Sequence, residues 1–176
     1  MAKKNRPPRE TVSNDDYFMS LAFWTATRSK DPHRQEGSVI ISKTDKVIAS
    51  EPNGVPGKIK DTDFSWDRVE RTDYVERAVQ NTLWEAACSD LSEARMYTTM
   101  WPTKRCIRAL IRAGIKRVTW FPLRKKMGLP AEHTDKEIEA IKKIATLGGV
   151  TLEEFKGNLN WMRDQMDKFK QAGIFN

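Results

Sequence analysis

The sequence is poor in the residues that form covalent or metal cross-links. It contains two cysteines and two histidines among 176 residues, which excludes a disulfide-bonded scaffold and leaves few side chains to hold a metal. Its longest apolar stretch, residues 17–27, falls well short of the roughly 20 residues that a membrane span needs. The N-terminus has no apolar core of a secretory signal. These absences predict a soluble cytoplasmic protein with no membrane contact.

Acidic residues are missing from residues 101–130, which contain nine lysines or arginines. The whole chain has a net charge of +7, so the rest of it sums to −2. Such a block can be an ordinary solvated surface, or it can attract phosphates or an acidic protein. With Trp101 and Trp120 nearby, it could bind nucleic acid by phosphate contacts and stacking. We define a candidate basic surface from two groups of residues. Lys104, Arg108 and Arg112 form a row of residues four apart, and Lys116 and Arg117 continue it past the next strand.

Strand and helix patterns alternate along most of the chain. Short β-branched runs predict strands at residues 38–42, 46–50, 95–101, 116–121 and 150–155. Capping residues and helical spacing predict helices at residues 14–29, 75–88, 102–113, 134–147 and 159–172. The polar stretch up to residue 72 and the basic stretch 123–133 are predicted as loops. This alternation favours an α/β layered fold. We divide the chain into a flexible basic arm (1–13), one globular domain (14–156) and a C-terminal amphipathic helix (157–176).

Two segments resemble one enzyme family. Residues 101–118 resemble the Pro-Cys-x-x-Cys helix, and the strand after it, of the zinc-dependent cytidine and deoxycytidylate deaminases. Residues 74–83 resemble the His-Ala-Glu-x-Asn-Ala-Ile helix of the same family. The strand from Gly37 and the loop from Asn53 follow in the family's order, and the resemblance covers about residues 14–155. It implies a cytidine-deaminase-like three-layer α/β/α sandwich with a central mixed sheet, here with an extra C-terminal helix.

The resemblance also implies a zinc site, and this sequence departs from it. In the family one His and two Cys hold Zn²⁺, and a Glu moves the proton during deamination. The His position is Arg77 here, the Glu position is Val79, the first Cys position is Thr103, and only Cys106 is kept. A guanidinium has no lone pair for a metal, valine carries no proton, and one thiol cannot replace three protein ligands. We therefore expect no zinc, no other cofactor and no catalytic residue; Cys106 is predicted to be a buried apolar side chain.

Parts of the family's substrate pocket are retained in the sequence. The resemblance implies that Asn53 contacts a sugar and that Trp101 lies beside the ring. The N-termini of both motif helices favour an anion, so a cation at Arg77 needs one beside it. Arg77 is predicted to bind a nucleotide phosphate or an acidic side chain, unless Glu76 turns inward or the guanidinium turns to solvent. Asn53, Arg77 and Trp101 are therefore the nucleotide-binding candidates.

These patterns predict a catalytically inactive protein related to the deoxycytidylate deaminases. It would act as a regulatory or structural subunit that still binds a pyrimidine nucleotide. Because the family works mostly as oligomers, we expect self-association or pairing with an active enzyme. Two alternatives stay open: a nucleic-acid-binding module that uses residues 101–130, and a deaminase-family hydrolase with a remodelled site.

Overall fold

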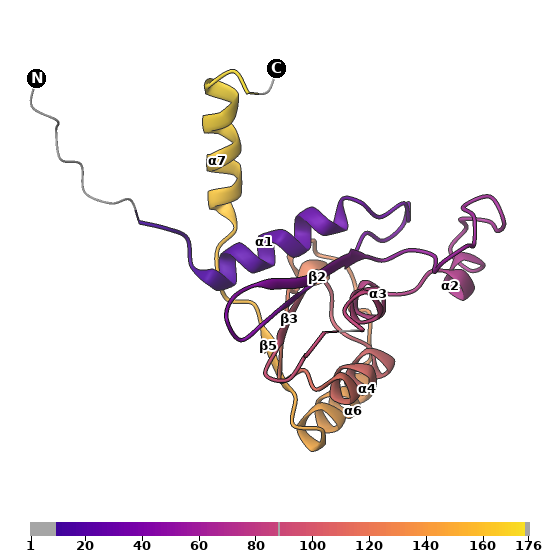
Figure 1. Cartoon of the computed structure of the whole chain (residues 1–176). Coiled ribbons are helices and arrows are strands. Elements are labelled where there is room, and N and C mark those ends of the chain that lie inside the picture. The colour runs from indigo at the N-terminus through magenta and orange to yellow at the C-terminus, as the bar shows by residue number, and fades with distance from the viewer. Residues whose placement is uncertain (1–9, 88, 175–176) are drawn as a thin grey trace, which may run out of the picture.

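The centre of the molecule is a mixed sheet. The structure, a computed structural model, describes residues 10–87 and 89–174, so most of the predicted N-terminal arm and Cys88 lie outside the described residues. Within them, five strands lie in the order β2-β1-β3-β4-β5 (Figure 1). β1 is antiparallel to β2 and β3, whereas β3, β4 and β5 are parallel. The strands are β1 (Gly37–Ile41), β2 (Val47–Pro52), β3 (Arg95–Thr98), β4 (Arg117–Trp120) and β5 (Thr151–Glu154).

Helices cover both faces of this sheet, as the predicted three-layer sandwich requires. α1 (Asn14–Ala26) packs on one face, and α3 (Ala78–Glu85), α4 (Lys104–Ala113) and α6 (Asp135–Leu147) pack on the other. α2 (Arg71–Tyr74) and α5 (Leu123–Lys126) are single turns. α7 (Asn160–Gln171) projects away from the body (Figure 1). The C-terminal helix of the prediction is therefore present, outside the sandwich.

β1 is buried at all five positions because both of its faces meet a helical layer. Val39 and Ile41 contact the α1 layer, where Phe18 and Met19 pack beside them. Ile40 points the other way, into the cluster formed with α3, α4 and α6. This explains the uninterrupted apolar run in the sequence, which is typical of a strand covered on two sides.

α4 has local signals at both ends. The Thr103 hydroxyl accepts a hydrogen bond from the Cys106 amide and caps the start of the helix. Gly114 ends it with a φ of 84°, a left-handed conformation that favours glycine. Between these ends, Ile107 and Leu110 are buried against the sheet. The predicted helix at 102–113 is confirmed, with its first helical residue two positions later.

The predicted helix at 75–88 was wrong at its start. Residues 75–77 are extended, and Glu76 exchanges two backbone hydrogen bonds with Gly54, of 2.9 and 3.1 Å. The helix α3 therefore begins at Ala78, and Arg77 is its N-cap residue with φ −68° and ψ 149°. Helical spacing could not reveal this because the pairing partner lies far away in the sequence. The single turns α2 and α5 likewise occur where loops were predicted.

Candidate functional site

The Arg77 side chain points inward at the start of α3. Its Nε atom lies 2.8 Å from a carboxylate oxygen of Glu36, and its Nη1 atom lies 2.7 Å from Oε1 of Glu132. Its Nη2 atom donates a 3.0 Å hydrogen bond to the carbonyl oxygen of Trp101. Glu76 faces elsewhere and pairs with Arg105 at 2.7 Å. The anions beside Arg77 are therefore two glutamates that precede β1 and α6.

Arg34 completes a cluster of alternating charges. Its Nη1 atom lies 2.8 Å from Oε1 of Glu132 and 3.7 Å from Oε1 of Glu36. The Glu36 side chain is only 2% exposed, and those of Glu132 and Arg77 are 13% and 19% exposed. We call Arg34, Glu36, Arg77 and Glu132 the charge cluster. It joins the segment before β1, the start of α3 and the segment before α6.

The charge cluster shifts the pKa of three of its members. Burial would lower the pKa of Arg77, but Glu36 and Glu132 raise it above the usual range, so the guanidinium stays charged. Burial, together with the nearby charge of Glu132, raises the pKa of Glu36 more strongly than Arg77 and Arg34 lower it. At Glu132 burial is outweighed by the same two arginines, and the pKa falls below its ordinary value. Glu132 is thus held as a carboxylate, whereas ionised Glu36 depends on the arginines.

We expect Glu132→Gln to lower the free energy of unfolding by about 1–3 kcal/mol at pH 7, because the arginines lose a charged acceptor. The folded pKa of Glu132 lies below the ordinary value of 4.5, so its contribution is present above that pH and is lost as the pH falls through the folded pKa. Urea denaturation at pH 7 and at about pH 3 should therefore show the loss shrinking. Exposed Glu139→Gln on α6 is the control. An equal loss at both pH values would contradict this role.

Both polar atoms of the Asn53 side chain form hydrogen bonds with other groups of the protein. Its Oδ1 atom accepts a 2.8 Å hydrogen bond from the Glu36 amide, and its Nδ2 atom donates to the carbonyl oxygen of Arg34 at 2.9 Å. Nδ2 also lies 3.2 Å from a carboxylate oxygen of Asp31, which pairs with Arg71. Asn53 is 2% exposed and holds the segment that carries Arg34 and Glu36. Its contact with a sugar stays a prediction.

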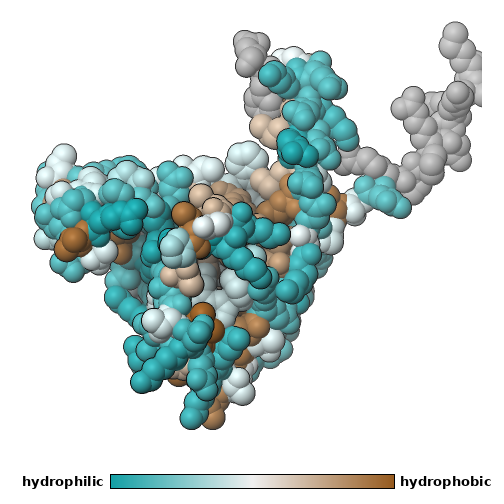
Figure 2. Space-filling view, turned by 180° about the vertical axis from the view of Figure 1, so that it is seen from behind, coloured by the Kyte–Doolittle hydropathy of each residue, from teal (hydrophilic) through white to brown (hydrophobic). Residues whose placement is uncertain are grey.

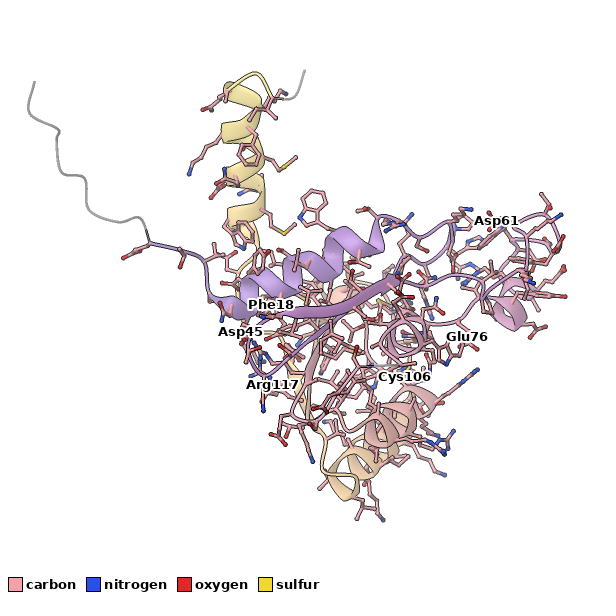
Figure 3. The ribbon with its side chains drawn as sticks, in the orientation of Figure 1. Phe18, Asp45, Asp61, Glu76, Cys106 and Arg117 are labelled. Carbon is pink, nitrogen blue, oxygen red and sulfur yellow. The ribbon has the colours of Figure 1, made fainter. Side chains whose placement is uncertain are left out.

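The other positions of the family's zinc site lie in the first turns of α3 and α4. Cys106 is fully buried, and its Sγ atom accepts a hydrogen bond from the Thr103 hydroxyl at 3.1 Å and donates to Oε1 of Gln80 at 3.5 Å. Val79 is also buried. Figure 3 shows Cys106 inside the fold, at the start of α4. Across residues 10–87 and 89–174, no three His, Cys, Asp or Glu side chains are grouped so that they could hold a metal ion.

The candidate basic surface divides between the two faces of the sheet. Lys104, Arg108 and Arg112 are carried by α4, where the two arginines are exposed. Arg117 instead faces α1, where it pairs with Asp15 at 3.0 Å (Figure 3). Lys116 is exposed just before β4. Arg117 therefore does not extend the row on α4, because neighbouring residues of a strand point to opposite faces.

Neither Glu36 nor Glu132 is among the site residues that the sequence predicts. Glu36 stands out in the sequence as a charge beside a strand that is otherwise apolar. Glu132 follows the acid-free residues 101–130 almost directly, which is its only local signal. Neither pattern indicates that both carboxylates contact Arg77, because these contacts join segments that are distant in the sequence.

Comparison with known proteins agrees with this fold. The family model described as the cytidine and deoxycytidylate deaminase zinc-binding region matches residues 12–121. The deoxycytidylate deaminase of Homo sapiens is 30% identical over 146 residues, which are 80% of this chain and 78% of that protein. A probable deoxycytidylate deaminase of Drosophila melanogaster is 31% identical over 124 residues, 64% of this chain and 61% of that protein.

Solved structures show the same fold. The dCMP deaminase of cyanophage S-TIM5, in complex with dCMP and dUMP, is similar with a TM-score of 0.62 at 19% identity, covering 84% of this chain and 100% of that one. Among the helices of the described residues, none is long and apolar enough to cross a membrane. On the extent of the family match and the identity to its curated relatives, this chain belongs to the cytidine and deoxycytidylate deaminase family.

Proposed function

We propose that this protein is a catalytically inactive relative of deoxycytidylate deaminase that acts in the cytoplasm as a regulatory or structural subunit. One observation carries the proposal. At the family's metal-binding His position stands the guanidinium of Arg77, which already has Glu36 and Glu132 as ion partners. A permanently charged cation, held in place by two carboxylates, takes up the place of a metal ligand.

The side chains at the family's zinc positions do not fit zinc. Zinc in a deaminase needs three protein ligands and an open position for water. Of Arg77, Thr103 and Cys106, only the thiol of Cys106 is a good donor, and its sulfur is engaged with Thr103 and Gln80. Val79 has no group that can move a proton. We derive no deamination step from these residues.

Surfaces outside the sandwich support a role as a subunit. α7 projects from the body, and on the back face apolar atoms gather below its base, among polar surroundings (Figure 2). On α1, the residues Tyr17 and Trp24 are 45% and 47% exposed. Exposed apolar side chains of this size favour protein contacts. We propose that the partner is a second copy of this chain or an active deaminase.

Retained binding of a pyrimidine nucleotide is a further part of the proposal. It is supported by Trp101, whose ring lies edge-to-face on Trp120 at a centroid distance of 4.4 Å. Asn53 and Arg77 would have to give up their hydrogen bonds to protein groups in order to bind a nucleotide.

A second candidate function, nucleic-acid binding, is favoured by the exposed arginines of α4. If this surface contacts six or more phosphates, the affinity for nucleic acid should fall by about 10³-fold or more between low and moderate salt.

The test is a joint measurement of zinc content and dCMP turnover. We expect the purified chain to hold far less than one zinc per molecule by mass spectrometry and to release no ammonia from dCMP with added zinc. The matched variant Arg77→His/Val79→Glu/Thr103→Cys, which restores the family's residues, is expected to gain zinc. Human deoxycytidylate deaminase serves as the positive control. Zinc-dependent turnover by the unaltered chain would overturn the proposal and favour a remodelled hydrolase.

A further inference from the structure

A groove of about 390 Å³ runs between α1 and β2, which is the edge strand of the sheet. Tyr17, Leu21 and Trp24 line it from α1, and Val47 lines it from β2. The residues Tyr17, Trp24 and Val47 are 45%, 47% and 48% exposed. The groove is therefore mainly apolar and open to solvent. Its place between a helix and an edge strand is far from the charge cluster at the start of α3 in the sequence and shares no lining residue with it.

The groove residues of α1 have the spacing of a helix that receives another helix. Tyr17, Leu21 and Trp24 are four and three positions apart, so they form one row along α1, which we call the α1 stripe. A neighbouring row of α1, with Phe18 and Ala22, is buried against the sheet. α1 thus carries a core stripe and a second, partly exposed apolar stripe. Grooves with such a stripe bind amphipathic helices in many complexes.

α7 carries an apolar row with the same spacing. Met162, Met166 and Phe169 are four and three positions apart, and we call them the α7 stripe. α7 projects from the body (Figure 1), and no helix or strand of the described residues packs along it. An amphipathic helix is stabilised mainly by laying its apolar stripe on another surface. The projecting position of α7 therefore favours contact with a second molecule.

The chain holds α7 away from its own groove. The Asn158 amide donates a 2.9 Å hydrogen bond to a carboxylate oxygen of Asp16, in the first turn of α1. From this anchor α7 leads away from the sandwich instead of running along α1 (Figure 1). The two helices nevertheless match in length. At 1.5 Å per residue, the 12 residues of α7 span about 18 Å and the 13 residues of α1 about 20 Å.

The area available indicates that both contacts of an exchange are needed. A fully buried aromatic side chain covers about 150–250 Å², so Tyr17 and Trp24 each still have roughly 100 Å² to bury. With Leu21 and Val47, one groove can bury roughly 300–400 Å². Each partner of a stable complex buries about 800 Å². A copy that both receives an α7 helix and gives its own approaches that area.

We propose that two copies of this chain exchange their α7 helices, so that the α7 stripe of each copy lies on the α1 stripe of the other. A two-fold axis makes the two contacts identical. The pair is therefore closed and leaves no groove open for a third copy. This inference rests on the proposed role as a subunit, for which it names the partner and the surface.

The first test is sedimentation velocity of the full chain from about 1 to 100 μM, where we expect a dimer. Trp24→Glu and Met166→Lys should each raise the dissociation constant about 30-fold or more, because a symmetric pair contains each substitution twice. Trp84→Glu and Met127→Lys are the matched controls and should leave it unchanged. Trp84 and Met127 are 50% and 61% exposed and lie outside both stripes and the groove. Circular dichroism checks that all four variants are folded.

The second test locates α7 on the partner. Isotope-labelled and unlabelled copies are mixed and treated with an amine-reactive cross-linker. Lys46 directly precedes β2, Lys168 lies on α7, and both are exposed. Mass spectrometry should find cross-links that join Lys46 of a labelled copy to Lys168 of an unlabelled one. Met166→Lys should reduce their yield, whereas Met127→Lys should not.

Three results would overturn the exchange. They are a chain that stays monomeric at about 100 μM, a dimer that Trp24→Glu weakens no more than Trp84→Glu does, and a dimer without cross-links between α7 and the partner's β2 segment. The proposed function fails in a different way. Zinc-dependent dCMP turnover by the dimer would overturn the inactivity and leave the exchange standing. A monomeric chain that binds an active deaminase would overturn the exchange and leave the subunit role standing.

Discussion

Arg77→Met is expected to lower the free energy of unfolding by about 3–5 kcal/mol at pH 7, the loss seen when one partner of a buried ion pair is removed. The variant leaves the Glu36 carboxylate, whose side chain is 2% exposed, with Arg34 at 3.7 Å as its remaining cation. Burial already raises the pKa of Glu36, so the acid will take up a proton more readily once Arg77 is gone. Urea denaturation followed by circular dichroism measures the loss.

The pH dependence of this loss has a definite sign. A carboxyl group whose folded pKa is raised contributes stability at pH values below its unfolded pKa, and this contribution is lost as the pH rises through the folded pKa. The deficit of Arg77→Met should therefore shrink as the pH is lowered toward 5, where Glu36 is neutral more often. A deficit that is constant with pH would mean that Glu36 is not the group left unpaired.

Two variants separate the buried pair from a general loss of charge. Arg105→Met removes an arginine that is 65% exposed and pairs with Glu76, and such a surface pair is worth less than about 1 kcal/mol. The double variant Arg77→Met/Glu36→Leu removes both buried charges and should recover most of the loss, since apolar replacement of a buried pair is often neutral. If Arg77→Met costs no more than Arg105→Met, the charge cluster is not a buried structural element.

Gly37→Ala is expected to destabilise the protein by about 3 kcal/mol, at the upper end of what an over-packed core costs. A Cβ atom at Gly37 would lie 2.0 Å from the carbonyl oxygen of Ala22 and 2.5 Å from the amide nitrogen of Ala26. Both atoms belong to the backbone of α1, so no flexible side chain can yield. The whole helix would have to move away from β1, whose residues are buried throughout.

Gly54→Ala is the matched control for this contact. A Cβ atom there meets nothing within 4 Å, so we expect a change within about 0.5 kcal/mol. Thermal and urea denaturation of the two variants should differ clearly. Equal stabilities would mean that α1 and β1 are not in the close contact that the fold requires.

The sequence by itself determined the layers of the fold and the family. Alternating strand and helix patterns are local signals, and each predicted strand and helix corresponds to an element of the structure, although the helix predicted at 75–88 begins only at Ala78. The motifs in residues 74–83 and 101–118 lead to the deaminase family, which the matched relatives show. The replaced residues Arg77, Val79 and Thr103 are likewise read directly from the chain, and the inactivity they imply stays a proposal.

Only the tertiary structure decided what surrounds Arg77. The sequence indicates that a cation at a helix N-terminus needs an anion, but the nearest acid in the chain, Glu76, turns to Arg105. Glu132 contacts Arg77 although 55 positions of sequence separate them, and Glu36 comes from the segment before β1. Periodicity and capping describe contacts within a few residues, whereas ion partners are chosen by how distant segments pack. For the same physical reason, the division of the basic surface between the two faces of the sheet could not be predicted from the sequence.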